Sequence, residues 1–427
     1  MANTTKWVAT NAAGRTARGI SVNGAPFFAK GVCYSPVPWG GSSNWTPFGD
    51  FFFPPWEAIW ERDLPLMRAA GINTIRTYNF QTVIYGHRRD HTPFLDACWN
   101  GGKNPVYVLI GCGALSDLHI YDLPWASTRP KRDAAKAAFL DLVKTYGTHP
   151  AVMGFLVGNE VNNGTTRVSP DFWRWIDSVA AACRAAAPDK LSTISVVDDS
   201  MITVINGDQY CPNLSMWGIN SYRGNIDYPQ TNNFTDLWSS FARHSAKPMM
   251  ITEWGAPAST HDAQGNLLFS AAVAAKLDNY VEGHYGDLRF NAVTTTSNGG
   301  AANLNAQNWA PVCVGSCYFE WTDEWWKFDA DYKDTPCAAT VQNPAVEAKP
   351  GRPGKSNAGF PGGWDDEECF GLNAIEPAGP DPMERPGPPG ANPSCPGPWD
   401  FAANAPYPPD ILHPRSTLAT LTAHWKR

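Results

Sequence analysis

The sequence lacks the features that mark a membrane span or a binding surface for polyanions. No uninterrupted apolar run approaches the roughly 20 residues that a membrane-spanning helix needs. The 33 Lys and Arg residues form no basic run, and with 40 Asp and Glu residues the net charge is −7. These absences argue against a membrane span, and against nucleic acid or an anionic membrane as the main partner.

The sequence also lacks the common metal-binding and targeting motifs. The ten cysteines include no pair of C-x-x-C motifs, and the histidines form no H-x-H or H-E-x-x-H pattern, so we expect no metal and no cofactor. The N-terminal stretch "MANTTKWVATNAAGRTARG" has no apolar h-region, so no signal peptide is visible. Disulfides would staple the irregular C-terminal part, and this favours a secreted or periplasmic protein; the cysteines there are Cys337, Cys369 and Cys395.

Aromatic residues are abundant. Of the 427 residues, 19 are Trp and 12% are aromatic. Aromatic faces stack on sugar rings, but Trp is also ordinary core material. Composition alone therefore leaves a carbohydrate ligand and a large aromatic core equally open.

Short apolar runs alternate with helical patterns from about residue 18 to residue 328. A small hairpin is expected across Asn23-Gly24, followed by strands in "FFAKGVCYS", "INTIRTYN", "VYVLIGCG", "AVMGFLVGN", "LSTISVVDD", "LSMWGINSY", "PMMITEWG" and "VCVGSCYFEW". Eight β/α units of this length predict a (β/α)₈ barrel of the α/β class. A doubly wound open sheet is the alternative, but no Gly-rich nucleotide turn follows the first strand.

The character of the chain changes near residue 328. We expect residues 1–328 to form the barrel with its N-terminal hairpin, and residues 329–427 to form a loop-rich extension packed on it. The Pro and Gly content of residues 331–411 is also typical of a disordered tail. Aromatic islands such as "FPGGWDDEECFGL" and a closing helix in "PRSTLATLTAHWKR" favour an ordered extension.

Two glutamates end predicted strands. Glu160 follows the fourth strand, in "GFLVGNEV", and Glu253 ends the seventh, in "MMITEWG". Active sites of such barrels lie at the C-terminal ends of the strands. Retaining glycoside cleavage needs two carboxyl groups about 5–5.5 Å apart, one as acid/base and the other as nucleophile. Each Glu could instead be a solvent-facing loop residue or a partner for an Arg.

Other polar and aromatic residues lie at the same predicted strand ends. Arg76 could orient the nucleophile, and Asn159 could bind the sugar 2-hydroxyl. Tyr222 could donate a hydrogen bond to Glu253 or be a buried structural residue. Trp321 could form the floor of the sugar subsite at the scissile bond. Asp198-Asp199 could cap the next helix, bind a sugar hydroxyl or suggest a metal. A rival set of carboxylates stands beside Trp321, namely Glu320, Asp323 and Glu324.

With these residues the chain resembles the fungal β-1,3-glucanosyltransferase family, within the large clan of retaining glycosidase barrels. The resemblance spans roughly residues 28–257 and is carried by "KGVCYSPVPWGGSSNWTPFGD", "RDLPLMRAAGINTIRTYN", "DHTPFLDACW", "GFLVGNEV", "VVDD" and "ITEWGAP". It implies that Glu160 is the acid/base and Glu253 the nucleophile. It further implies sugar-binding positions at Tyr34, Tyr78, Asn159, Asp199 and Tyr222. The secretion and lipid-anchor signals of the family and the Cys-bearing pattern after its sixth strand are not recognised here, and the Pro/Gly extension has no recognised counterpart in the family.

The sequence thus predicts a retaining enzyme that acts on β-glucan by hydrolysis or by transfer, and the resemblance favours the β-1,3 linkage. A hydrolase of another β-glycan, such as mannan, and a non-catalytic glycan-binding barrel are the alternatives. The substrate would be an oligo- or polysaccharide, and the sequence leaves the oligomeric state open.

Overall fold

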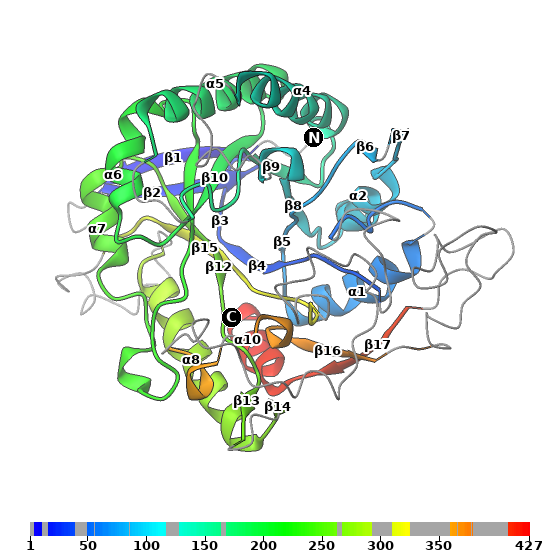
Figure 1. Ribbon diagram of the computed structural model, residues 1–427, viewed down its shortest axis with the longest axis vertical. Helices are drawn as coiled ribbons and strands as arrows, with labels where there is room; N and C mark the ends of the chain where they lie inside the picture. The colour runs from blue at the N-terminus through cyan, green and yellow to red at the C-terminus, as the bar shows by residue number, and fades with distance from the viewer. Residues whose placement is uncertain are drawn as a thin grey trace, which may run out of the picture.

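A closed barrel of parallel strands forms the centre of the molecule (Figure 1). The computed structural model describes residues 4–10, 16–38, 49–54, 56–84, 86–116, 128–163, 168–262, 267–292, 310–324, 359–364, 366–376, 378 and 409–427. Within them, eight strands close the barrel in chain order: β4 (Ala29–Cys33), β5 (Thr74–Arg76), β8 (Tyr107–Gly111), β9 (Val152–Leu156), β10 (Leu191–Val197), β11 (Met216–Asn220), β12 (Met249–Trp254) and β15 (Cys313–Tyr318). The predicted (β/α)₈ barrel is confirmed.

Burial on both faces explains why these segments are continuously apolar. Every residue of β8, β9, β11 and β12 is buried. Inward side chains fill the barrel, and outward ones pack under the helices. Glu253, in β12, is an acidic residue inside one of these buried strands, which is why it is a candidate for function and not for packing.

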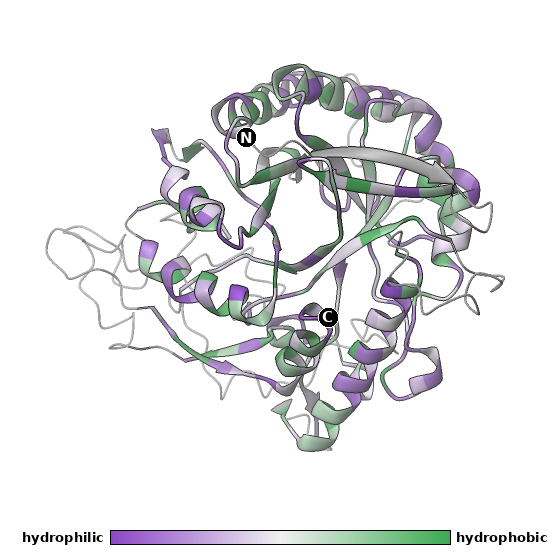
Figure 2. Cartoon of the chain, turned by 180° about the vertical axis from the view of Figure 1, so that it is seen from behind, coloured by the Kyte–Doolittle hydropathy of each residue, from purple (hydrophilic) through white to green (hydrophobic). Residues whose placement is uncertain are grey.

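Helices surround the barrel and present apolar faces to it. They are α1 (Glu57–Ala70), α2 (Thr92–Trp99), the short α3 (Gly113–Ser116), α4 (Arg129–Tyr146), α5 (Pro170–Ala186), α6 (Ile202–Gly207), α7 (Leu237–His244), α8 (Ala271–Phe290) and α10 (Ser416–Trp425). Hydrophilic and hydrophobic residues alternate along them, as amphipathic helices require (Figure 2). In α5 the buried residues include Phe172, Trp173 and Ile176.

A small antiparallel sheet covers the end of the barrel opposite the strand C-termini. It is formed by β1 (Thr4–Thr10), β2 (Thr16–Val22) and β3 (Ala25–Phe27). The predicted turn at Asn23-Gly24 has φ values of 53° and 79°, the left-handed conformation that suits an Asn-Gly hairpin turn. The N–H of Arg18 donates to the carbonyl of Pro311, just before β15. The hairpin is confirmed, whereas β1 was not predicted.

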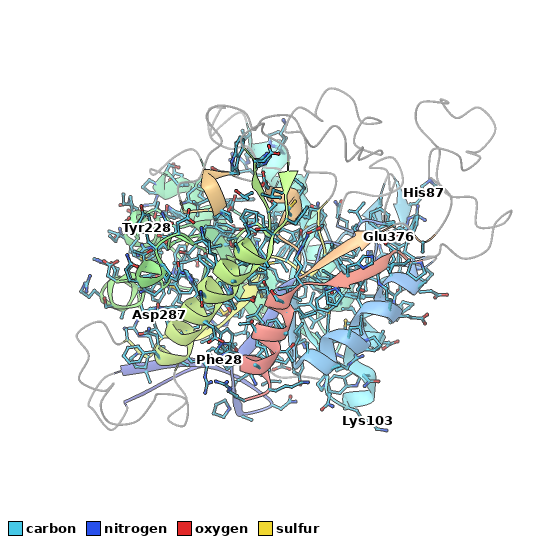
Figure 3. All side chains as sticks on the ribbon, turned by 90° about the horizontal axis from the view of Figure 1, so that it is seen from below. Phe28, His87, Lys103, Tyr228, Asp287 and Glu376 are labelled. Atoms are coloured by element: carbon cyan, nitrogen blue, oxygen red, sulfur yellow. The ribbon has the colours of Figure 1, made fainter. Side chains whose placement is uncertain are left out.

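The closing helix α10 completes the outer ring of helices. It packs against α8 on one side and α1 on the other (Figure 3). Leu421 and Trp425 of α10 are 0% and 2% exposed. Gly71, which ends α1 with φ of 90°, lies so close to Trp425 that an added Cβ would be 3.2 Å from its backbone. The last helix of the chain thus occupies the position after the eighth barrel strand.

Other described parts of residues 329–427 also contact the barrel. A hairpin pairs β16 (Asn373–Glu376) with β17 (Ile411–Pro414). The described residues of the 359–372 segment, 359–364 and 366–372, lie against the loops after β11, β12 and β15. A domain boundary at residue 328 stays a prediction. Cys369 is a buried free thiol, and Cys337 and Cys395 lie outside the described residues. Two further short hairpins are β6 (Val83–Ile84) with β7 (His87–Arg88), and β13 (Thr260–His261) with β14 (Leu267–Leu268).

Candidate active site

Glu253 is held by donors from the ends of two other strands, β5 and β11, at the mouth of the barrel. Its side chain is nearly buried, with the residue 5% exposed. Oε1 accepts from Arg76 Nη1 at 2.6 Å and from the Tyr78 hydroxyl at 2.7 Å, and Oε2 accepts from the Tyr222 hydroxyl at 2.9 Å. Donors therefore engage both carboxylate oxygens, an arrangement that stabilises an anion and fixes its orientation.

Arg76 supplies the positive charge of this site. It ends β5, is 1% exposed, and forms a buried ion pair with Glu253. Burial alone would lower the pKa of Arg76, but the groups of Tyr78 and Glu253 outweigh it, and the net shift is upward. Its guanidinium also donates to the carbonyl of Thr252 at 2.8 Å and to the Asn159 side-chain oxygen. The cation is thus fixed in place and remains charged.

Glu160 follows β9 and is the second carboxylate of the site. Its Oε1 accepts a hydrogen bond from Asn220 Nδ2 at 3.0 Å. Burial, and after it the negative charge of Glu253, raises the pKa of Glu160 to about 7. A carboxyl group with this pKa carries a proton near neutral pH and can give it to a leaving group.

Asn220 connects the two carboxylates and was not among the predicted site residues. Its Nδ2 donates to Glu160, while its Oδ1 accepts from Arg76 Nη1 at 3.2 Å. Ser195 and Thr252 hydroxyls donate to the same Oδ1, at 2.6 and 2.8 Å, and so fix the amide orientation. The alternation of side chains along a strand could have identified it, because Asn220 lies two residues before Tyr222 in "GINSY".

The structure brings four predicted residues together with the glutamate pair. Arg76, Tyr78 and Tyr222 touch Glu253, and Asn159 touches Arg76. The Asn159 oxygen also accepts from Asn220 Nδ2 at 3.4 Å. Trp321, after β15, is 1% exposed, and its backbone N–H donates to Cys33 at the end of β4. Whether Trp321 floors a sugar subsite stays a prediction.

Tyr34 lies at the end of β4 but faces away from this network. It is fully buried, and its hydroxyl donates to Asp63 of α1 at 2.7 Å. Its ring packs on Phe52 and Phe94, with centroids 5.5 and 6.4 Å away. These contacts tie α1 to the barrel, and a sugar contact of Tyr34 stays a prediction.

The rival carboxylates beside Trp321 have other surroundings. Asp323 forms a two-pronged ion pair with Arg415, with Nη1–Oδ1 and Nη2–Oδ2 distances of 2.6 and 2.8 Å. Glu320 and Glu324 are buried, at 0% and 3% exposed. The Asp323 carboxylate therefore joins the chain before α10 to the barrel, whereas a role for Glu320 or Glu324 in the site stays a prediction.

Asp199 anchors the start of α6. Its carboxylate accepts from the backbone N–H of Thr203, at 3.0 Å to Oδ2, and from Asn162 Nδ2 at 3.3 Å. The first N–H groups of a helix have no partner within the helix, so a carboxylate there stabilises it. Of the roles considered for Asp199, the structure supplies the capping contacts, and a sugar contact stays a prediction.

Replacing Asp199 with alanine is expected to lower the free energy of unfolding by about 1 kcal/mol, because the Thr203 N–H at the start of α6 loses its acceptor. Urea denaturation measures the change. Asp171→Ala removes an exposed carboxylate that pairs with Arg174 and serves as the control, with an expected change below about 0.5 kcal/mol. Equal stability of Asp199→Ala and the native chain would contradict the capping role.

A pocket of about 430 Å³ opens beside the carboxylate network. Its lining includes Asn220 and Tyr222 of the network together with polar side chains, namely Asp198, Ser200, Arg223, Asp236 and Ser240. Arg223 Nε donates to Asp198 at 2.6 Å, so the charges of the wall are paired. The volume and the polar lining suit a small polar ligand unit.

Two further findings concern the described residues alone. No group of three or more His, Cys, Asp or Glu side chains in them is placed to hold a metal ion. None of their helices is long and apolar enough to cross a membrane.

Comparison of sequences relates the chain to fungal enzymes. No protein-family model matches it. It is 30% identical over 145 residues to a 1,3-beta-glucanosyltransferase of Saccharomyces cerevisiae, which covers 34% of this chain and 26% of the yeast protein. Similar enzymes of Schizosaccharomyces pombe (27% over 263 residues; 56% and 45% covered) and Candida albicans (24% over 312 residues; 67% and 63% covered) also match. The resemblance predicted from the motifs is confirmed. The chain spans less than two thirds of the length of each of these relatives.

Comparison of folds finds glycosidase barrels. A beta-glucuronidase from an uncultured Clostridium species matches with a TM-score of 0.54 at 14% identity, covering 99% of this chain and 53% of the other. A beta-D-glucuronidase from Dictyoglomus thermophilum matches with a TM-score of 0.52 at 13% identity, covering 99% and 54%. At such identities these matches show the fold alone.

Proposed function

We propose that this protein is a retaining enzyme that cleaves β-1,3-glucan and transfers the cleaved chain to a sugar hydroxyl or to water. The observation that carries the proposal is the environment of the two glutamates: Glu253 is held by a buried cation and two hydroxyls, and Glu160 has a pKa of about 7. These are the environments that a nucleophile and a proton donor need.

In the first step, Glu253 attacks the anomeric carbon while the glycosidic C–O bond breaks. The departing oxygen takes the proton of Glu160, so the step leaves a glycosyl ester on Glu253 and an ionised Glu160. Arg76, Tyr78 and Tyr222 hold the attacking carboxylate in a single orientation, which removes the need to order it during the reaction.

In the second step, Glu160 takes a proton from the incoming hydroxyl, whose oxygen attacks the anomeric carbon and releases Glu253. The ester of Glu253 carries no charge, so the repulsion that helps to raise the pKa of Glu160 is absent in the intermediate. The pKa of Glu160 therefore falls after the first step, when the residue changes from acid to base. Hydrolysis and transfer differ only in the hydroxyl that enters.

The polar pocket that Asn220 lines supports binding of the sugar on the leaving-group side. It is lined by residues after β10 and β11, the strands that follow β9 around the barrel, and shares Asn220 with the contacts of Glu160. The leaving group must lie next to the acid that protonates it. The relatives named as 1,3-beta-glucanosyltransferases support a β-1,3-linked donor and a sugar acceptor.

Incubation with laminari-oligosaccharides of one defined length tests the proposal. We expect products both shorter and longer than the substrate, separated by chromatography, because the acceptor competes with water for the glycosyl ester. Shorter products alone would identify a hydrolase. Cleavage of another β-glycan such as mannan, with none of the laminari-oligosaccharides, would contradict the proposed linkage, and no cleavage of any β-glycan would favour a glycan-binding barrel.

A further inference from the structure

Aromatic side chains from two distant parts of the chain surround the tyrosines that hold Glu253. Phe319, after β15, lies 6.4 Å from Tyr78 and 6.5 Å from Tyr222 between ring centroids, edge to face with both. Phe360 and Phe370 lie 6.1 and 5.9 Å from Tyr222, also edge to face. We refer to these five residues as the aromatic cluster. Its Phe360 and Phe370 come from residues 359–372, beyond the predicted end of the barrel.

Residues 359–372 are attached to the loops around Glu253 by backbone hydrogen bonds. The carbonyl of Gly359 accepts from Ile226, after β11, and that of Cys369 accepts from Ala258, after β12. The carbonyl of Phe370 accepts from Glu320, after β15. The segment therefore joins loops that follow three consecutive barrel strands.

Side chains reinforce the attachment to the loop after β12. Asp366 accepts from the Ser259 hydroxyl at 2.6 Å and pairs with His261 Nε2 at 2.8 Å. Trp364 stacks on the His261 ring, with centroids 3.9 Å apart. Phe360 and Phe370 are each 3% exposed, so their rings are held within the packing and not in solvent.

We propose that Phe360 and Phe370 are positioning residues that hold the Tyr222 hydroxyl on the nucleophile Glu253, so that residues 359–372 complete the active site. Tyr222 is fixed at one end by its hydrogen bond to Oε2 of Glu253 and along its ring by the two phenylalanines. Without those rings the Tyr222 side chain gains rotational freedom. Its hydroxyl then donates to the Glu253 carboxylate in a smaller fraction of the molecules. The inference rests on the proposed function, since it assumes that Glu253 is the nucleophile.

The charge of the same segment supports its place at the site. Burial and the charge of Glu253 are the main causes of the raised pKa of Glu160, and Glu367 adds to them. Glu367 acts on the pKa of Tyr222 in the same direction, after burial and the two catalytic glutamates. Its carboxylate is therefore close enough for its field to reach both sides of the site.

A double-mutant cycle between Phe370 and Tyr222 tests the inference. Phe370→Leu is expected to lower kcat on laminari-oligosaccharides about tenfold, with KM changed by less than about threefold, because the loss is in the orientation of the nucleophile. Tyr222→Phe removes the hydroxyl itself. In the Tyr222→Phe background, Phe370→Leu is expected to lower kcat by less than about twofold, because the contact through which it acts is already gone. Phe360→Leu repeats the cycle with the second ring, should Phe370→Leu not fold.

Phe139→Leu is the matched control, because it truncates an equally buried ring that packs on Phe155 between α4 and β9. It is expected to lower stability while kcat stays within about twofold of the native value. An equal loss of kcat from Phe370→Leu in both backgrounds, or no loss in either, would overturn the inference while the proposed function stands. Activity that survives in Glu253→Gln, or a native chain with no activity, would overturn both.

Discussion

Replacing Glu253 with glutamine is expected to lower kcat on laminari-oligosaccharides by about 10⁴-fold or more. An amide of the same shape keeps the packing but cannot form the glycosyl ester, and double displacement has no other route. The ion pair with Arg76 is lost as well, which leaves a buried guanidinium facing a neutral group. The measurement is the initial rate of product formation against enzyme concentration.

Rescue by an external nucleophile distinguishes loss of the Glu253 carboxylate from misfolding of the site. In Glu253→Ala, azide has room to attack the anomeric carbon from the side that Glu253 occupies, while Glu160 protonates the leaving sugar. The expected product is a glycosyl azide of inverted configuration, identified by NMR. Glu57→Gln, on the exposed first turn of α1, is the control and should keep full activity. Glu253→Gln with a rate within tenfold of the native value would show that another residue attacks.

Replacing Glu160 with glutamine is expected to lower kcat by about 10³-fold on oligosaccharides, whose leaving oxygen needs a proton. Aryl β-glucosides with an acidic phenol as leaving group should lose much less in the first step, because the phenolate departs without help. A smaller loss of rate on aryl β-glucosides than on oligosaccharides, measured with the same Glu160→Gln variant, would identify Glu160 as the acid. A loss of equal size on both would contradict it.

The pH profile of the native enzyme provides an independent measure of the same group. Glu160 must be protonated to act as acid, and burial, followed by the charge of Glu253, raises its pKa to about 7. We therefore expect kcat/KM to decline as the pH rises through about 7, since the proton is lost there. This alkaline limb should be absent in Glu160→Gln. A limb that persists unchanged in the variant would belong to a different group.

The barrel and its two glutamates could be predicted because their signals are local. Continuous apolar runs reveal strands buried on both faces, and a carboxylate such as Glu160 or Glu253 at the end of one marks the mouth of the barrel. Asn220 carries the same kind of signal, but an amide in a strand stands out less than an acid. The strand β1, Thr4–Thr10, is not predicted because its sequence "TTKWVAT" is largely polar and without regular alternation, and it is defined by pairing with β2.

The rest depends on partners that are distant in sequence. A position at the end of a barrel strand predicts that a side chain lies near the mouth of the barrel, but it does not predict the direction in which the side chain points. The Tyr34 hydroxyl donates to Asp63, and the Asp199 carboxylate accepts from the Thr203 N–H. Phe360 and Phe370 lie in a stretch rich in Pro and Gly, without periodicity. Their place beside Tyr222 follows from hydrogen bonds to loops that are distant in sequence, the nearest at Glu320 and the farthest at Ile226. No pattern in the segment itself encodes those contacts.

Because α10 packs between two helices that are synthesised before it, the ring of helices around the barrel is completed late in synthesis. Its neighbours α1 and α8 are made long before it, and α1 is near the other end of the chain. Until residues 416–425 have left the ribosome, the surfaces that receive Leu421 and Trp425 are exposed to water. Contacts of such high sequence separation form slowly, because the intervening chain must first be ordered or looped out. A nascent chain that stops before α10 therefore holds Glu160 and Glu253 in a barrel whose ring of helices is still open.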